Sequence, residues 1–157
     1  MRESDWPAVR DIYREGISTG DATFETDAPE WAAWDAGHLP VCRLVARHED
    51  TIGGWAALSP VSKRPAYAGV AEVSIYVSAH YRGRGLGRRL LGALISASEA
   101  REIWTLQAAI FPENRASIVL HEKLGFRTVG RRDRIAQRNG KWRDTVLLER
   151  RSEAVGI

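Results

Sequence analysis

The segment Tyr81-Arg82-Gly83-Arg84-Gly85-Leu86-Gly87-Arg88 is the most informative stretch of this chain. Its three glycines alternate with other residues, and it separates a strand-like apolar pattern from an amphipathic helical pattern. Glycine lets the backbone bend tightly and approach a ligand, and the N-terminus of a following helix attracts anions. The interspersed arginines add full positive charges. The segment therefore predicts a phosphate-binding loop.

The residues that this loop lacks narrow the choice of phosphate ligand. A P-loop has Lys followed by Ser or Thr after its last glycine, whereas Gly87 is followed by two arginines, which argues against a magnesium nucleotide. A dinucleotide fingerprint needs a third glycine at a spacing that the loop does not supply, and no acidic residue follows at the expected distance. The pattern that remains is Arg82-x-x-Gly85-x-Gly87.

Length and composition favour one domain over residues 1–157, because 44% of the residues are hydrophobic and can form a substantial core. Lys and Arg number 23 against 20 Asp and Glu, and much of the excess lies in residues 82–89 and 127–138. This clustering favours local anion sites over a diffuse nucleic-acid footprint, although a pI near 9.3 keeps nucleic-acid binding open as an alternative. We expect no nucleic-acid partner.

The remaining composition indicates the compartment. The single cysteine, Cys42, excludes an internal disulfide and is expected to be a packed thiol rather than a nucleophile. No signal-peptide pattern and no long apolar run is present, so we expect a cytoplasmic protein with no membrane partner. The four histidines show no ligand spacing, and we expect no metal.

Helical and strand patterns alternate along the chain, which predicts an α/β class. Helices are expected at residues 7–15, 30–36, 85–100 and 115–124, and strands at 41–47, 51–58, 71–78, 104–110, 127–137 and 142–150. Asp5 is expected to cap the first helix, Gly125 to end the last one, and Asn139-Gly140 to form a hairpin turn.

The strand at residues 71–78 precedes the glycine loop and has two distinct faces. Because side chains alternate along a strand, one face carries Ala71, Val73, Ile75 and Val77 and the other carries Glu72, Ser74 and Tyr76.

The pattern Arg82-x-x-Gly85-x-Gly87 is similar to the pyrophosphate-binding signature (Gln/Arg-x-x-Gly-x-Gly/Ala) of the GNAT superfamily of N-acetyltransferases. The order of elements resembles that fold over nearly the whole chain, including a Pro-Glu-Asn helix start at 112–114 and Leu-Gly-Phe at 124–126 before the hairpin. The resemblance implies a mixed, mostly antiparallel sheet flanked by helices. It also implies direct acetyl transfer from acetyl-CoA to an amine, without an acyl-enzyme.

Within that superfamily, four segments resemble the phosphinothricin and methionine sulfoximine acetyltransferases: Ala22-Thr23-Phe24-Glu25-Thr26, Arg64-Pro65-Ala66-Tyr67, Ala71-Glu72 and His121-Glu122-Lys123-Leu124-Gly125-Phe126. The resemblance implies a homodimer that acetylates the α-amino group of a small amino-acid analogue such as phosphinothricin, methionine sulfoximine or methionine sulfone.

Two features depart from that family. The usual first strand is expected to be missing or reduced to residues 1–3, because the chain starts almost at its first helix. Trp142-Arg143-Asp144 stands where phosphinothricin enzymes often carry Trp-His-Asp, which leaves the preferred acceptor side chain open.

The resemblance implies a cofactor site made of the glycine loop, the edge of the preceding strand and the start of the last helix. Arg82, Gly83, Arg84, Gly85, Leu86, Gly87 and Arg88 would hold the pyrophosphate. Backbone groups of Ile75, Tyr76 and Val77 would pair with the pantetheine arm and offer an N–H to the acetyl oxygen, unless the strand is purely structural. Asn114 would contact coenzyme A, cap its helix, or do both.

Glu72 and His121 are the expected catalytic residues. Glu72 is interpreted as a general base acting through water and as an anchor for the substrate ammonium, with a surface carboxylate as the alternative. His121 occupies a position where many superfamily members carry a tyrosine acid. It either protonates the leaving thiolate or packs at the edge of the core.

The acceptor site is expected to involve Lys63, Arg64, Glu72, Val73 and Ser74, with Phe24 and Glu25 shaping the same pocket. A planar guanidinium suits a substrate carboxylate, whereas a solvated loop charge is the alternative. The arginines of residues 127–138 are interpreted as a solvated strand face, with a contact to the 3′-phosphate of coenzyme A as the alternative.

Two rival functions stay open at this stage. The acceptor amine could belong to a protein N-terminus or a polyamine, although Lys63 and Arg64 favour an acidic acceptor. A module that senses coenzyme A, or that reads nucleic acid through its arginines, would bind without turnover.

Overall fold

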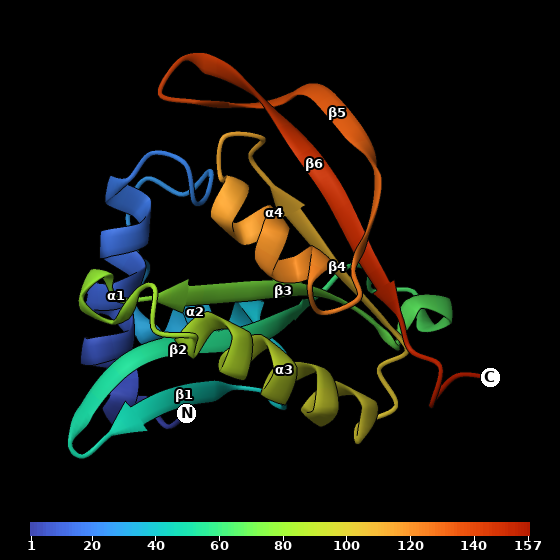
Figure 1. Ribbon diagram of the computed structural model, residues 1–157, viewed down its shortest axis with the longest axis horizontal. Helices are drawn as coiled ribbons and strands as arrows, with labels where there is room; N and C mark the ends of the chain where they lie inside the picture. Colours follow the sequence, from blue (N-terminus) through green and yellow to red (C-terminus); the bar gives the residue numbers. More distant parts are fainter.

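A six-stranded mixed sheet in the order β1-β2-β3-β4-β6-β5 organises the computed structural model, which describes residues 1–157 (Figure 1). The strands are β1 Leu44–His48, β2 Thr51–Pro60, β3 Val70–Val77, β4 Thr105–Ile110, β5 Arg127–Arg138 and β6 Lys141–Arg151. The helices are α1 Trp6–Ser18, α2 Trp31–Gly37, α3 Leu86–Glu99 and α4 Arg115–Glu122, with short 3-10 turns η1 Glu3–Asp5, η2 Pro65–Tyr67 and η3 Ala79–Tyr81.

Each face of the sheet has its own apolar core. Strands β2, β3, β4 and β6 contribute to the core under α3 and α4, and β2 alone supplies the buried strand residues under α1 and α2. Residues alternate between the two cores along β2, where Trp55 and Ala57 face α1 while Ala56 and Leu58 face α3. Strand β2 is therefore buried on both faces.

Strands β3 and β4 are the only parallel neighbours, and they part soon after they meet. Their pairing covers Val70–Glu72 of β3 and Thr105–Gln107 of β4, whereas every other neighbouring pair is antiparallel. Figure 1 shows the two strands diverging from a common end, with α4 beside the opening. The expectation of a mixed, mostly antiparallel sheet is confirmed.

The common end of β3 and β4 is held by Gly69. Its carbonyl accepts hydrogen bonds from the backbone N–H groups of Trp104 (2.8 Å) and Thr105 (3.0 Å). The indole of Trp104 lies against this glycine so closely that a Cβ built there would be 2.1 Å from the ring. Only glycine therefore fits at the point where the two arms of the sheet join, one made of β1, β2 and β3 and the other of β4, β6 and β5.

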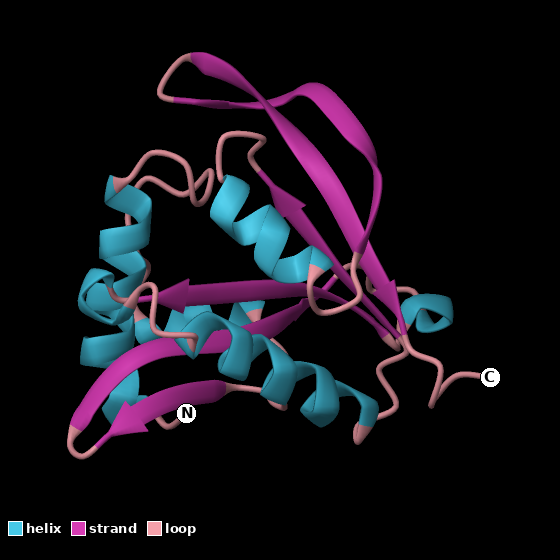
Figure 2. Cartoon of the chain, in the orientation of Figure 1, coloured by secondary structure: helices cyan, strands magenta, loops and turns pink.

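Local turn signals were accurate for the later elements. Asn139 and Gly140 both have positive φ (50° and 75°), as a tight hairpin turn requires, and Gly125 has φ 87° just after α4. The hairpin of β5 and β6 extends away from the helices (Figure 2).

Two expectations near the N-terminus were wrong in detail. The Asp5 side chain makes no cap bond to α1. It accepts instead from the backbone N–H of Arg2 (2.7 Å) and from Arg47 (2.6 Å). The strand expected at 41–47 begins only at Leu44, because Cys42 has φ 58° and interrupts extended backbone. Residues 3–5 form the turn η1, and no strand precedes α1.

No helix in the structure combines the length and apolar character needed to span a bilayer. Cys42 packs against the α3 core, and burial raises the pKa of its thiol, as expected for a packed residue.

Candidate active site

The glycine loop forms a candidate anion-binding site at the start of α3. Gly83 (φ 74°) and Gly85 (φ 76°) have left-handed backbone, and Gly85 is the N-cap residue. Neither has a heavy atom within 4 Å of where a Cβ would lie, so the space above both is open. The backbone N–H groups of Leu86, Gly87 and Arg88 have no backbone acceptor, as is usual in a first helical turn. These free donors, together with the helix dipole, favour a bound phosphate.

The third glycine of the loop has a different role. A Cβ on Gly87 would lie 3.3 Å from Leu120 of α4 and 3.8 Å from Val77 of β3. Gly87 thus allows α3 to approach α4 closely beside the candidate anion-binding site.

The arginines of the loop are exposed and form no ion pair, so their charges are not neutralised within the chain. The Nε of Arg82 donates to the carbonyl of Val77 (3.2 Å), and the Arg84 guanidinium lies over the Tyr81 ring at 5.9 Å. The exposed guanidinium of Arg88 has no hydrogen-bond partner in the chain. The loop therefore presents positive charge beside the free N–H groups.

Part of β3 beyond its pairing with β4 has a free backbone edge. The N–H of Ser78 donates to Gly53 of the strand on the other side (2.9 Å), and antiparallel pairing alternates along a strand. Backbone groups of Val73, Ile75 and Val77 therefore point away from β2, toward the gap between the two arms. An extended ligand segment could pair with this edge as an added strand would.

Tyr76 differs from its two neighbours on β3. By the same alternation, its backbone groups pair with β2, and its ring stacks on Trp55 at 4.8 Å in the α1 core. Burial raises the pKa of its hydroxyl, and the nearby Tyr13 adds to the rise. Of the three residues expected to pair with pantetheine, Ile75 and Val77 have the free backbone groups.

Glu72 lies at the vertex where the arms diverge. Its Oε2 accepts a hydrogen bond of 2.7 Å from Nε2 of Gln107, its register partner on β4. The carboxylate is half-buried and lies on the strand face opposite Val73 and Ile75. Gln107 thus orients the expected general base. No sequence pattern indicates this contact, because the register between two strands that are far apart in the chain is not visible in the sequence.

His121 lies inside the structure, with a residual exposure of 1%. Its Nδ1 bonds the carbonyl of Ser117 (2.8 Å), its ring packs edge-on against Phe126, and its buried Nε2 has no partner. Burial lowers the pKa of the imidazole, which favours the neutral form. This environment favours the packing alternative for His121 over the acid.

Asn114 is confirmed as the N-cap of α4. Its Oδ1 accepts from the backbone N–H of Ser117 (3.2 Å), and its Nδ2 donates to the carbonyl of Asp21 (3.3 Å). Both ends of the side-chain amide are therefore used within the protein.

Lys63 and Arg64 lie in the loop between β2 and β3, exposed and without an ion pair. The Arg64 guanidinium is 5.9 Å from the centre of the Tyr67 ring. Neither side chain forms a hydrogen bond or an ion pair with Glu72, Val73 or Ser74. Both remain available cations at the vertex end of β3.

The arginine-rich strand β5 is an exposed face, as expected. Arg127 pairs with Glu149, and Arg131 pairs with Asp133 and Asp144. No group of three or more His, Cys, Asp or Glu side chains is arranged to hold a metal ion.

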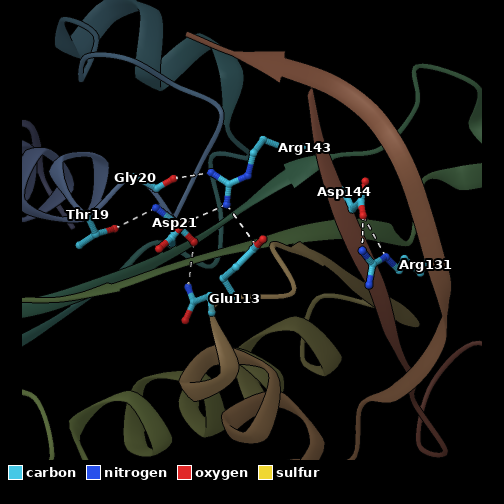
Figure 3. Close-up of polar contacts among 8 residues, drawn as sticks. Thr19, Gly20, Asp21, Glu113, Arg131, Arg143 and Asp144 are labelled. Atoms are coloured by element: carbon cyan, nitrogen blue, oxygen red, sulfur yellow. Dashed lines mark hydrogen bonds and ion pairs between the residues drawn. The ribbon is translucent and has the colours of Figure 1, made fainter. Parts of the chain in front are cut away.

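The loop 19–30 after α1 is joined to the far arm of the sheet. Phe24 packs edge-on against Phe111 after β4, and Arg143 of β6 contacts Asp21 and Glu113 (Figure 3). In the sequence, Trp142-Arg143-Asp144 is only a departure from a motif, and the role of Arg143 depends on its tertiary contacts.

Comparison with known proteins identifies this arrangement. The Acetyltransferase (GNAT) family model matches residues 6–126. The chain belongs to the GNAT family. It is 34% identical to phosphinothricin N-acetyltransferase of Alcaligenes faecalis, over 96% of this chain and 79% of that one. It is 30% identical to the L-methionine sulfoximine/L-methionine sulfone acetyltransferase of Pseudomonas aeruginosa, over 93% and 88% of the two chains.

Solved GNAT structures have the same fold. A ribosomal-protein-alanine N-acetyltransferase from Brucella melitensis superimposes with a TM-score of 0.87 at 29% identity, covering 97% of both chains. A GNAT phosphinothricin acetyltransferase from Sinorhizobium meliloti, solved in complex with acetyl-CoA, gives a TM-score of 0.84 at 29% identity, covering 99% of this chain and 92% of that one. The chain is thus an acetyl-CoA-dependent N-acetyltransferase.

The observed site fits that GNAT cofactor. The free N–H groups of the first α3 turn and the open space over Gly83 and Gly85 suit a pyrophosphate, and the β3 edge suits the amides of a pantetheine arm.

Proposed function

We propose that the enzyme acetylates the α-amino group of a small amino-acid analogue of the phosphinothricin, methionine sulfoximine or methionine sulfone type. The observation that carries the reaction geometry is the position of Glu72. This half-buried carboxylate, oriented by Gln107, lies where the free edge of β3 begins. A base and backbone donors beside one another are what attack of an amine on a thioester requires.

The proposed reaction is a direct transfer. The loop that begins at Arg82 and includes Gly83, Arg84, Gly85 and Arg88 holds the pyrophosphate, and the edge of β3 holds the pantetheine arm. Glu72 accepts a proton from the acceptor ammonium through water, and the free amine attacks the carbonyl carbon of the thioester. An N–H of the β3 edge stabilises the developing oxyanion. The C–S bond then breaks.

The leaving thiolate takes its proton from water in this scheme. The buried, neutral imidazole of His121 supports this choice over a direct role as acid. Asn114 is proposed to act on the cofactor only indirectly, by fixing the start of α4, since both ends of its amide are occupied.

The acceptor class is supported by the relatives and by the charges near the vertex. Two curated relatives at 34% and 30% identity act on phosphinothricin and on methionine sulfoximine or sulfone. Lys63 and Arg64 are unpaired cations in the loop that precedes β3 and suit an acceptor carboxylate. Val73 and Ser74, which follow Glu72, would line the acceptor pocket.

A protein N-terminus is the second candidate acceptor. The similarity to the Brucella melitensis structure of a ribosomal-protein-alanine N-acetyltransferase favours it. A peptide acceptor would present an amine without a nearby carboxylate, so the two candidates differ in the charge that the site must hold.

Thiol release from acetyl-CoA tests both candidates. The panel contains phosphinothricin, methionine sulfoximine, methionine sulfone, ordinary amino acids, their amides, polyamines and peptides that begin with alanine. We expect the highest kcat/KM for the first three acceptors. A higher kcat/KM for the peptides would move the assignment to protein acetylation, and tight cofactor binding with no turnover on any acceptor would indicate a sensor.

We infer that the enzyme is a homodimer. Large apolar side chains of the β5–β6 hairpin are exposed: Val129, Ile135 and Trp142. Three exposed apolar side chains on one hairpin favour its association with a protein surface. Sedimentation equilibrium gives the mass in solution, and a monomer at micromolar concentration would contradict the inference.

A further inference from the structure

Three groups of this chain already engage the guanidinium of Arg143 on β6. It donates to the carbonyl of Gly20 (3.0 Å), to Oδ1 of Asp21 (2.8 Å) and to Oε2 of Glu113 (3.1 Å) (Figure 3). The hydrogen bond that Arg143 donates to Asp21 is the main cause that raises the pKa of Arg143. The side chain is only 19% exposed. Two carboxylates around one guanidinium compensate its charge.

An aromatic contact reinforces this arrangement. The Arg143 guanidinium lies over the Phe111 ring at 4.1 Å, and the ring of Phe24 meets Phe111 edge-on at 4.8 Å. Phe111 is buried and follows β4 directly. Arg143 and Phe24 thus contact a common ring, which couples the loop 19–30 to the arm of the sheet that contains β4 and β6.

A second arginine of the hairpin holds the same region. Arg138 of β5 donates to the carbonyl of Ile17 (2.8 Å), close to the C-terminal end of α1. Cations stabilise the last carbonyls of a helix. Arg138 and Arg143, on the two sides of the hairpin turn, therefore both donate hydrogen bonds to backbone carbonyls at or just after the end of α1.

Another part of the loop lies beside Tyr76 of β3, because the Tyr76 ring and the Cβ of Ala22 lie 2.6 and 3.7 Å from where a Cβ on Gly16 would be. Thr23 and Glu25 lie close enough to Tyr13 and Tyr76 to affect the pKa of both phenols. Tyr76 shares its strand face with Glu72. The loop 19–30 therefore bridges the two arms of the sheet on the side where Glu72 lies.

We propose that Arg143 is a positioning residue that holds the loop 19–30 across the two arms of the sheet, so that Phe24 and Glu25 form one wall of the acceptor pocket. The proposal rests on the proposed function, because it assigns this wall to the acceptor. It also excludes Arg143 as the cation for an acceptor carboxylate, since Asp21 and Glu113 already neutralise it.

The test compares three variants of the full chain. Arg143→Ala removes all three hydrogen bonds, and Arg143→Lys keeps a charge that cannot reproduce the planar fork. Arg131→Ala is the matched control, because Arg131 belongs to the same hairpin, is exposed, and pairs only with Asp133 and with Asp144 (Figure 3). Acceptor KM, kcat, acetyl-CoA affinity by calorimetry and hydrogen exchange of residues 19–27 are measured for each.

We expect Arg143→Ala to raise the acceptor KM by about tenfold or more, the scale for lost hydrogen bonds to a charged group. Acetyl-CoA affinity should stay unchanged, and amides of residues 19–27 should exchange faster while those of α3 do not. Arg143→Lys should restore part of the KM, and Arg131→Ala should match the parent in every measurement.

Unaltered exchange in residues 19–27 of Arg143→Ala would overturn the proposal. An equal loss of acceptor and acetyl-CoA affinity would also overturn it, because that result indicates general damage. If Arg143→Ala does not fold, Asp21→Asn weakens the same contact from the loop side and is held to the same outcomes. Since exchange needs no turnover, a failure of the proposed function leaves the role of Arg143 testable on its own.

Discussion

Gly85 combines left-handed backbone with open space in front of the first N–H groups of α3. Gly85→Asp puts a negative charge where the pyrophosphate is proposed to bind, so acetyl-CoA affinity should collapse. The positive φ adds a modest strain of roughly 1 kcal/mol, so the melting temperature should fall only slightly. Calorimetry with acetyl-CoA and thermal unfolding check the two effects.

Two controls separate charge from strain at Gly85. Gly85→Ala introduces the strain alone and should lose far less affinity. Gly92→Asp places the same charge later in α3, where a Cβ meets nothing within 4 Å, and should leave binding intact. Full affinity in Gly85→Asp would remove the glycine loop from the cofactor site.

Glu72 is held by Gln107 and is proposed as the general base. Glu72→Gln should lower kcat by about 10²-fold, the usual scale for a positioned base, and should shift the pH profile toward alkaline values, where free amine already exists. Steady-state kinetics over pH measure this. Glu149→Gln is the matched control on the next strand, opposite Gln107, and should keep parental kcat. Parental kcat at neutral pH in Glu72→Gln would reduce the carboxylate to a structural role.

Arg64 is exposed and unpaired in the loop before β3. If it binds the acceptor carboxylate, Arg64→Ala should cost about 1.5 to 3 kcal/mol, or roughly 10- to 150-fold in acceptor KM. An acceptor amide should be a poor substrate that is indifferent to the change. Arg101→Ala, an exposed arginine between α3 and β4, is the control. Equal penalties for acids and amides would contradict the contact.

At the scale of elements, the site depends on where β3 and β4 separate. The two strands share only three residue pairs, and Gly69 joins their common end through two backbone hydrogen bonds. The separation exposes the backbone of β3 next to the N-terminus of α3. The site therefore exists because the two strands diverge. A change at Gly69, where they join, should lower the free energy of unfolding of the whole domain.

Gly69→Ala tests this vertex. The new Cβ would lie 2.1 Å from the Trp104 ring, and overpacking of this kind costs about 1 to 3 kcal/mol of unfolding free energy. Gly92→Ala, in the open interior of α3, should instead stabilise by about 0.5 to 1 kcal/mol. Chemical denaturation of both variants measures these opposite signs. A Gly69→Ala variant as stable as the parent would show that Trp104 can move aside.

For the whole molecule, buried imidazoles and paired carboxylates set the dependence of stability on pH. Burial lowers the pKa of both His38 and His121 below the unfolded value. The unfolded state then binds more protons below about pH 6.5, so stability should fall as the pH drops through that value. Thermal unfolding across this range should show a smaller decline for His121→Gln than for the parent. Identical slopes would indicate that His121 does not contribute.

A second loss of stability is expected at lower pH. Hydrogen bonds and ion pairs lower the pKa of several carboxyl groups: Asp5, Asp27, Glu99 and Asp144. These carboxylates stabilise the fold fully above their pKa in the unfolded chain, which is about 4, and this stabilisation is lost as the pH falls below that value. Urea unfolding at low salt measures this step, and added salt should weaken the contribution of the exposed pairs.

The local features of this enzyme were predictable from its sequence. The alternating glycines predicted the left-handed turns before α3, Asn139-Gly140 predicted the hairpin, and Asn114 predicted a helix cap, because each depends on bonds between residues only a few positions apart. The two faces of β3 also followed from simple alternation. These signals were enough to indicate the family and its cofactor.

The contacts around Glu72 and the loop 19–30 depend on how the elements pack together and were not predictable from the sequence. Gln107 reaches Glu72 through a strand register, and His121 is buried by elements distant in sequence. Arg143 meets Asp21 across more than a hundred residues. Register, burial and long-range ion pairs are set by how whole elements pack, since the same residue types also occur as solvated surface groups. The sequence therefore predicted the cofactor loop, and the packing of β4, β6 and the loop after α1 determined its surroundings.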